Sequence, residues 1–294
     1  MNLPNNPEHK FLVSWFFDVR DGNPNGDPDR EGSPRVDPLT HQGLVTGTCL
    51  KHKLRQEVVA QGLAVDNNKI YLEGQSGALD TKHIEAFTAL EVPVVSKPAP
   101  EQSTALVSWM LSRYWDSRVF GALMIGNASP GGARGAILVS RARSIDRIRV
   151  IDMAITRCAI SKEEELLSVA NPGGKTNEMG RSSIVPYGLY RCNIYYMPGI
   201  GIKNGVSSND LDIFWSSLLH IWENDRSVMR GEMATQSMYV FEHDSPLGHG
   251  NDVDYFKRVT ATKLCEGEPT GINDYEIKCD WSNPVDGVTL HEPV

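Results

Sequence analysis

Apolar and aromatic residues dominate the segment from Phe11 to Val19, which predicts a β-strand near the start of the sequence. One face of this strand carries Phe11, Val13, Trp15, Phe17 and Val19, and the other face is also largely apolar. A strand that is apolar on both faces needs cover on both sides, so we expect it at the centre of a sheet. Residues 20–43 are rich in proline and glycine, which predicts a long loop.

Three later segments have the hydrophobic period of an amphipathic helix. Thr46 can cap the first, which is expected to run to about Gln61 and to stop at Gly62. Its apolar stripe predicts a core side, and its cations predict a basic side. The stripe is Leu50, Leu54 and Val58, and the cations are Lys51, His52, Lys53 and Arg55. The other two helices are expected at 104–116 and, capped by Ser208, at 211–224.

The remaining segments of strand composition complete the expected fold. They lie at 134–143, 148–157, 184–197 and 237–241, with a short additional strand at 69–73. Without insertions, the order of elements is β, α, β, β, then β, α, β. This order predicts an α+β protein with an RRM-like (ferredoxin-like) antiparallel sheet and helices on one face. Residues 66–116 and the glycine-rich stretch 161–184 interrupt it as insertions.

The composition of the 294 residues, 40% hydrophobic and 22% charged, is that of a folded chain. Long apolar runs are missing, and the first ten residues lack the apolar core of a secretory signal, so we expect neither a membrane span nor secretion. The five cysteines are widely spaced and form no C-x-x-C pair, which disfavours a disulfide scaffold and a structural zinc site. A cytoplasmic protein is expected.

Charge is distributed unevenly along the sequence. The formal net charge is −8, but residues 266–294 alone carry seven acids and one lysine, a net −6. Residues 133–158 carry six arginines and two aspartates, a net +4. Because binding to a polyanion depends on local potential, the overall negative charge does not exclude nucleic acid. The acidic end could equally be a solubilising tail.

Two motifs resemble ion-binding loops but have the wrong spacing. Residues 21–27 place Asp and Asn at calcium-loop offsets, but Gly32 stands where the bidentate acid is required. Residues 173–176 (GGKT) resemble a phosphate loop, but Val169 replaces its first glycine. Lys175 and Arg181 of this stretch remain candidate contacts to a nucleic-acid backbone. Since no paired catalytic constellation is present, we expect no catalytic residue, no metal and no cofactor.

Cations recur in several separate elements, and each set has an ordinary interpretation as solvated surface or as the end of a helix. They occur on the helix after Thr46, in the strands that begin at Arg134, and at Arg226 and Arg230. If these elements converge on one open-faced sheet, the combination favours RNA, because such a sheet can offer its exposed face to a single strand.

Several sequence blocks together resemble the backbone subunit of type I-C CRISPR Cascade complexes. The most specific lie near the N-terminus: FDVRDGNPNGDPD (17–29), PRVDP (34–38) and GLVTGTCLKHKLR (43–55). Others follow in order, namely RVFGA (118–122), GGARG (131–135), MGRSSIVPYGLYR (179–191), WENDRSVMRGEM (222–233) and YVFEHD (239–244). The NPNGDP loop is also similar to type I-B backbone proteins, but the C-terminal blocks resemble type I-C more.

This resemblance implies one RRM-like palm over residues 1–294, with a helical finger at 66–116 and a thumb hairpin at 161–186. Copies would stack along a CRISPR RNA, and each thumb would displace a base and leave short stretches free to pair with target DNA in an R-loop. The implied partners are further copies of the chain, a guide-processing subunit, a large subunit that recognises the protospacer-adjacent motif, a small subunit and a recruited helicase-nuclease.

The resemblance also implies roles for individual residues. Asn23, Asn25, Asp27 and Arg35 would lie beside the guide, and Lys51, Lys53 and Arg55, with His52, would meet its phosphates. Arg118 and Phe120 would line the groove, and Met179, Arg181 and Tyr187 would belong to the thumb and its base. Two departures concern His52, where the family commonly has a denser basic run, and Ala136, where it commonly has proline.

Two other functions remain open. Related backbone subunits of type III complexes cut target RNA with an acidic loop residue, and Asp27, Asp29 or Asp37 could do so with a divalent metal. A general single-strand binder unrelated to CRISPR is the third hypothesis.

Overall fold

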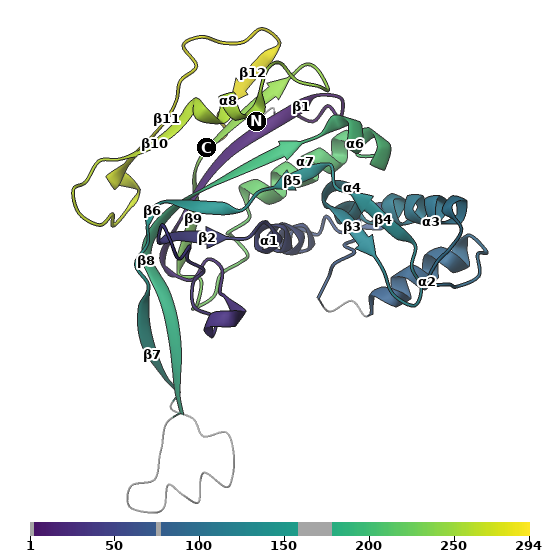
Figure 1. The fold of residues 1–294 in the computed structure, drawn as a ribbon, viewed down its shortest axis with the longest axis horizontal. Coiled ribbons are helices and arrows are strands. Elements are labelled where there is room, and N and C mark those ends of the chain that lie inside the picture. The colour runs from purple at the N-terminus through teal and green to yellow at the C-terminus, as the bar shows by residue number, and fades with distance from the viewer. Residues whose placement is uncertain (1–2, 75–77, 158–177) are drawn as a thin grey trace, which may run out of the picture.

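The aromatic segment near the start of the sequence forms β1 (Lys10–Gly22), which lies in the middle of an eight-stranded sheet (Figure 1). The computed structural model describes residues 3–74, 78–157 and 178–294. β1 pairs with β8 (Glu178–Tyr196) on one side and with β9 (Glu232–His243) on the other. The described strand pairs of this sheet are all antiparallel. The predicted α+β class and the central position of this strand are therefore confirmed.

The sheet has the strand order β12–β9–β1–β8–β6–β2, and β5 and β7 also pair with β8. These strands are β2 (Gln42–Val45), β5 (Ile137–Val139), β6 (Ala142–Arg147), β7 (Ile151–Arg157) and β12 (Val288–His291). The connection from β1 to β6 passes over β8, and the connection from β8 to β9 passes over β1. The first part of β8 continues beyond the sheet and forms a two-stranded arm with β7 (Figure 1).

Helices α1 (Gly47–Ala60) and α7 (Ser208–Leu219) supply apolar side chains to the core on one face of the sheet. Trp15 and Phe17 of β1 are fully buried there and contact the Trp222 ring at centroid distances of 5.8 and 5.1 Å. Burying an aromatic or aliphatic side chain contributes about 1.5–3 kcal/mol, so this core is the main support of both helices.

The opposite face of the sheet is covered, so the expected open face is absent. Phe16 and Leu12, which point away from α1, pack in a second core against the C-terminal segment. That segment contains α8 (Asp252–Lys257), β10 (Val259–Lys263) and β11 (Tyr275–Cys279). Its buried contributors are Tyr255, Phe256, Val259 and Tyr275. The acidic C-terminal residues therefore include folded cover for the sheet, which both apolar faces of β1 require.

A helical unit with its own core lies beside α1 and α7. It contains α2 (Leu79–Ala89), α3 (Pro100–Arg113) and the hairpin of β3 (Gly121–Met124) and β4 (Gly131–Arg134). Its core comprises Tyr71, Ala86, Phe87, Leu106, Met110, Tyr114, Met124 and Ala128. The unit includes the interval 66–116, and the hairpin continues it to residue 134.

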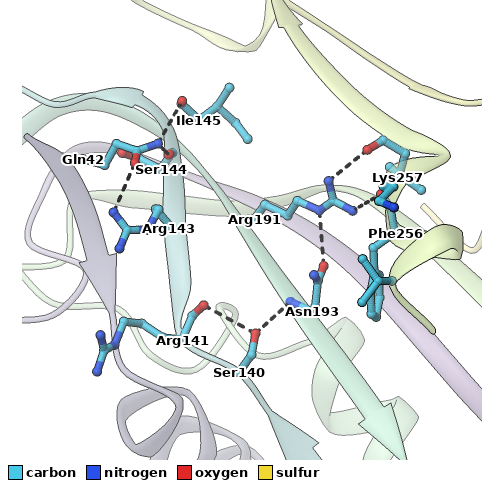
Figure 2. A pocket seen from close by; sticks show the side chains of 12 residues that line it. Gln42, Ser140, Arg141, Arg143, Ser144, Ile145, Arg191, Asn193, Phe256 and Lys257 are labelled. Carbon is cyan, nitrogen blue, oxygen red and sulfur yellow. Dashed lines mark hydrogen bonds between the residues drawn. The ribbon is translucent and has the colours of Figure 1, made fainter. Parts of the chain in front are cut away.

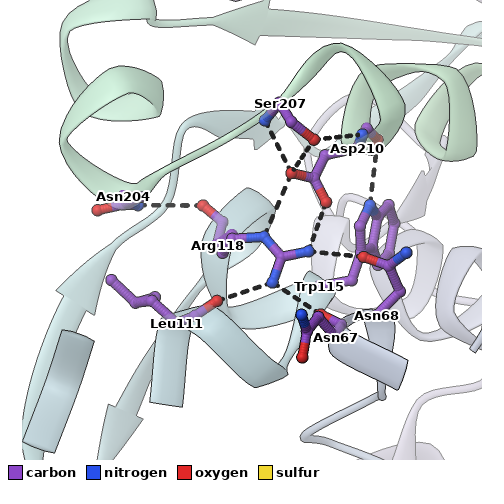
Figure 3. A network of polar contacts seen from close by, with 8 residues as sticks. All are labelled: Asn67, Asn68, Leu111, Trp115, Arg118, Asn204, Ser207 and Asp210. Atoms are coloured by element: carbon purple, nitrogen blue, oxygen red, sulfur yellow. Dashed lines mark hydrogen bonds and ion pairs between the residues drawn. The ribbon is translucent and has the colours of Figure 1, made fainter. Parts of the chain in front are cut away.

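Arg118, on α4 (Trp115–Phe120), fastens this helical unit to α7 (Figure 3). Its guanidinium forms a forked ion pair with Asp210, at 3.2 Å from Nε and 2.6 Å from Nη2. The other donors reach the backbone oxygens of Asn67 and Leu111 and Oδ1 of Asn68. All five N–H groups are thus satisfied. The expectation that Arg118 lines an RNA groove is corrected, because its side chain is buried and has no free donor.

The remaining helical segments are short. They are α6 (Pro198–Asn204) and the 3-10 helices η1 (Pro28–Arg30), η2 (Asp66–Asn68) and η3 (Ile272–Asp274). Within residues 3–74, 78–157 and 178–294, every helix is too short or too polar to cross a membrane.

Most predicted elements are confirmed, and four differ from the structure. The expected helix 104–116 is divided at Tyr114 between α3 and α4. Residues 69–73 form no strand, and Lys69 makes only an isolated bridge to Tyr114. The expected strand 134–143 is divided among β4, β5 and β6. A side chain at Gly135 would place Cβ 2.3 Å from the Phe120 oxygen, so only glycine permits this close turn after β4. The cap of α7 is Ser207.

Replacing Arg118 with alanine would leave the Asp210 carboxylate buried without its counter-charge. Breaking a buried ion pair from one side costs about 3–5 kcal/mol. We expect a loss of that order in the free energy of unfolding, measured by urea denaturation with tryptophan fluorescence.

The matched control is Asp212→Asn, an exposed position on the same helix. It should change the unfolding free energy by less than about 0.5 kcal/mol. An Arg118→Ala effect as small as that of the control would show that the fork does not hold the two units together.

Candidate nucleic-acid interface

The turn at residues 22–27 is tied to the start of α1 by one asparagine. Asn25 Oδ1 accepts hydrogen bonds from the backbone N of Thr46 (3.0 Å) and from its hydroxyl (3.1 Å). Thr46 in turn caps α1, because its Oγ1 accepts from the backbone N of Cys49 (3.1 Å). The predicted loop residue Asn25 is therefore a structural support of the helix.

Asp225 joins the loop 225–231 to the same place. Its carboxylate forms ion pairs with Lys53 on α1 and with Arg230. Arg230 also donates to the backbone oxygens of Asn23 (3.2 Å) and Pro24 (3.0 Å). A Cβ at Gly22 would lie 1.9 Å from the Arg230 oxygen, so the turn and the loop meet as bare backbone. The turn, the start of α1 and the loop thus form one connected unit, which we call the basic shelf (residues 22–27, 46–53 and 225–231).

Two of the four cations expected on a solvated side of α1 are instead buried. Lys53 is 2% exposed and pairs with Asp225. Arg55 is 6% exposed and donates from Nε to Asp116 at 2.6 Å, with its guanidinium over the Phe120 ring. The expectation of a wholly basic side is therefore wrong. Helical spacing could not reveal that these two face carboxylates from distant parts of the sequence.

Burial changes the pKa values of the shelf cations. Desolvation lowers the pKa of Lys53, and hydrogen bonding to Asp225 opposes this change. Burial and then the charge of Arg55 lower the pKa of Lys51. Burial and then Lys53 lower the pKa of His52 from its ordinary 6.5, so its imidazole is mainly neutral at pH 7. His52 can therefore donate a hydrogen bond there but contributes little charge.

Three cationic or potentially cationic side chains of the shelf remain available to a ligand. Lys51 is partly exposed and His52 is exposed, and neither has a hydrogen bond or ion pair within the described chain. Arg226 is exposed and donates only to the backbone oxygen of Glu223 (3.3 Å). Arg35, nearby in the loop after β1, pairs with Asp27 at 3.3 Å and is about one-third exposed.

The other predicted residues divide into distant, buried and undescribed positions. Arg134 is exposed on β4 of the helical unit, away from the shelf. Buried residues are Asn23, which donates to the Gly32 oxygen, Phe120 in the main core, and Tyr187, which donates to Asp18 at 3.0 Å. Met179 and Arg181 lie on β8, but their side chains are outside the described residues. Lys175 and most of the interval 161–186 are outside them altogether.

The acids weighed as metal ligands have internal partners in two of three cases. Arg143 and the backbone N–H groups of Leu39 and Thr40 lower the pKa of Asp37 to about 2. Asp27 accepts from the backbone N of Asp29 and pairs with Arg35, whereas the Asp29 side chain is exposed. In the part of the chain that the structure describes, no group of three or more His, Cys, Asp or Glu side chains could hold a metal ion.

Comparisons with known proteins give a single family. The family model described as CRISPR-associated protein Cas7 matches residues 8–280. A curated protein of Haloferax volcanii, CRISPR-associated protein Cas7, is 40% identical over 62 residues, which span 21% of this chain and 18% of that protein.

Solved structures of low sequence identity also match. A chain of a CRISPR RNA-guided surveillance complex in a pre-nicking state is 14% identical, with a TM-score of 0.49 and coverage of 79% of this chain and 78% of that chain. A chain of the type III-B Cmr-beta complex bound to cognate target RNA is 13% identical, with a TM-score of 0.40 and coverage of 79% and 61%.

Substituting methionine for Lys53 should destabilise the protein because Asp225 would keep only the longer pair with Arg230. We expect a loss of about 3 kcal/mol in the free energy of unfolding, at the low end for a broken buried pair because Asp225 is partly exposed. The measurement is urea denaturation, and the double variant Lys53→Met/Asp225→Asn should recover part of the loss.

Lys51→Met is the control, since this lysine of the same helix has no partner among the described residues. It should cost less than about 0.5 kcal/mol. Equal losses in the two single variants, or a double variant less stable than Lys53→Met, would contradict the role given to Asp225.

Proposed function

The chain belongs to the Cas7 family of CRISPR-associated proteins, and on this basis we propose that it is a non-catalytic, RNA-binding backbone subunit of a type I-C effector complex. In this role several copies bind side by side along one CRISPR RNA and hold it for pairing with target DNA. The observation that carries the proposal is the basic shelf, where unpaired cations are presented by a rigid set of internal contacts in a chain of net charge −8.

The shelf supports recognition of a backbone rather than of bases. Lys51 and Arg226 can each neutralise a phosphate, and neutral His52 can donate a hydrogen bond to a phosphate or ribose oxygen. Contacts of this kind fix position without reading sequence, which suits a subunit that must accept any guide. Sequence recognition is then delegated to base pairing.

The buried cations have a different role in this proposal. Lys53, Arg55 and Arg118 fix the shelf, α1 and the helical unit relative to one another. They do not contact the guide themselves. Because several copies hold one RNA, modest contacts in each copy combine into stable loading.

The sheet supports an RRM-like palm. Its four central strands have the order β9–β1–β8–β6, and each helical crossover passes over one strand, as in a split βαβ arrangement. The helical unit around α2 and α3 would be the finger, and the arm of β7 and β8 would be the base of the thumb. The type I-C assignment is supported by the C-terminal blocks WENDRSVMRGEM and YVFEHD, since type I-B backbone proteins share the NPNGDP loop. The proposed partners are the other subunits of that complex and a recruited helicase-nuclease.

Reversing two shelf charges, in Lys51→Glu/Arg226→Glu, should release the guide. We expect the ratio of co-purified RNA to protein to fall by at least about five-fold near physiological salt, because each lost phosphate contact lowers the affinity and its salt dependence. Absorbance and sequencing of the bound RNA provide the measurement, and circular dichroism checks the fold.

Lys203→Glu, at an exposed position on α6, changes charge away from the shelf and serves as the control. RNA retained by the double variant, or lost equally from the control, would argue against the shelf. Co-purified RNA without a CRISPR repeat sequence would favour the general single-strand binder.

We expect no cleavage when guide-loaded protein is incubated with complementary RNA and magnesium. Asp37 is committed to Arg143 and Asp27 to Arg35, which leaves Asp29 with too few neighbouring ligands for a catalytic metal. Denaturing gels would detect products. Regularly spaced cuts that disappear in Asp29→Ala would instead establish the nuclease alternative.

A further inference from the structure

A cavity of about 470 Å³ lies where the C-terminal segment meets the edge of the sheet (Figure 2). Its walls come from β6, β8 and the link between β5 and β6 on one side, and from α8 and β10 on the other. The polar lining includes Arg141, Arg143, Arg191, Lys257, Ser140 and Asn193, and none of the described residues that line it is an acid. No residue of the basic shelf lines this cavity.

Arg191 lies partly buried in this cavity without an acidic partner. Nε donates to Asn193 Oδ1 (3.2 Å), Nη1 to the Val259 oxygen (2.9 Å) and Nη2 to the Phe256 oxygen (2.6 Å). These neutral acceptors use three of its five N–H donors and leave two. Within the described chain it has no ion pair, whereas Lys53, Arg55 and Arg118 each pair with a carboxylate. Its guanidinium also lies over the Phe16 ring at 5.5 Å, but it has no counter-ion among the described residues, which favours an anion nearby.

The pairing of strands places a second arginine opposite the first. Arg143 on β6 is the register partner of Arg191 on β8, and like charges in directly opposed positions are destabilising. The two side chains turn apart: Figure 2 shows Arg143 directed toward Gln42 and Arg191 toward the Phe256 carbonyl. The cavity lies at this divergence. Arg143 is neutralised by Asp37 at 2.6 Å, so the imbalance rests on Arg191.

Arg141 adds a cation at the entrance. It is exposed and its guanidinium has no hydrogen bond or ion pair within the described residues. Lys257, on the opposite wall, is exposed and pairs with Asp254. Arg141 and Arg191 thus both line a cavity that is also lined by Ile145, Phe256 and Val259, and Figure 2 shows their guanidiniums directed to opposite sides.

We propose that this cavity binds the phosphate backbone of a nucleic-acid strand other than the guide. Guanidinium forks match phosphate oxygens, and the apolar lining suits a sugar. An acidic segment of another copy is the alternative occupant, and the oligomeric state measured in the test below distinguishes it.

The cavity lies on the side of the sheet covered by the C-terminal segment, whereas α1 and the shelf lie on the other side. A single strand along the shelf is therefore separate from one held here. This inference rests on the proposed function for its second strand, since pairing of a guide with duplex DNA leaves one strand free.

The test is Arg141→Glu, with Arg147→Glu as the matched control. Both arginines are exposed and have no ion pair within the part of the chain that the structure describes, but Arg147, at the end of β6, lies outside the cavity lining. Binding of a labelled oligothymidylate of about 20 nucleotides to the purified, RNA-loaded protein is measured by fluorescence anisotropy across a salt series. We expect Arg141→Glu to weaken binding about ten-fold and to lower the salt slope by about 1, with less than about two-fold weakening in the control.

Guide content is measured on the same samples and should be unchanged in both variants. Equal weakening by the two variants would overturn the proposal, because it would show that binding depends on the overall charge of the protein and not on the cavity. Loss of guide RNA from Arg141→Glu would also overturn it and assign the cavity to the guide. A change in oligomeric state with unchanged oligonucleotide binding would identify a protein segment as the occupant. If the wild-type protein carries no CRISPR RNA, the proposed function fails, while the oligonucleotide comparison still tests the cavity.

Discussion

Three buried ion pairs set the relative positions of the parts of this molecule. Arg118–Asp210 joins α4 to α7, Arg55–Asp116 joins α1 to α4, and Lys53–Asp225 joins α1 to the loop after α7. Hydrophobic contacts are non-directional and would allow these elements to slide, whereas a charge removed from water requires its partner in one geometry. The buried ion pairs of Lys53 and Arg55 therefore fix the position of α1, and with it the position of its partly or fully exposed side chains Lys51 and His52.

The division between hidden and exposed cations explains where sequence reasoning succeeded and where it failed. The hydrophobic period of α1 and α7 and the apolar character of β1 were sufficient to predict these elements, because each is determined by neighbouring residues. Whether Lys53 faces solvent depends on Asp225, which is 172 positions away. Local pattern contains no information about such a pair. The acid Asp225 precedes the two arginines Arg226 and Arg230 in the segment 222–233, but this order does not indicate a partner on α1.

The cover over the second sheet face has a similar explanation. The apolar second face of β1 was noted, and it placed the strand correctly at the centre, but the same observation also requires cover on that side. The C-terminal segment supplies it through Tyr255, Phe256 and Tyr275, of which only Tyr275 lies in the acidic stretch 266–294. Net charge obscured these aromatic positions, since a segment can be acidic on its outer surface and still contribute to a core.

β8 is one continuous strand of 19 residues that belongs to both the sheet and the arm. Residues 178–184 of β8 pair with β7, and residues 185–195 pair with β1. Pro186 restricts the backbone where the two pairings meet. With no loop at this junction, the arm cannot swivel independently of the central strand. The seven paired residues of extended chain, at about 3.3 Å each, therefore place the far end of the arm about 23 Å from the sheet.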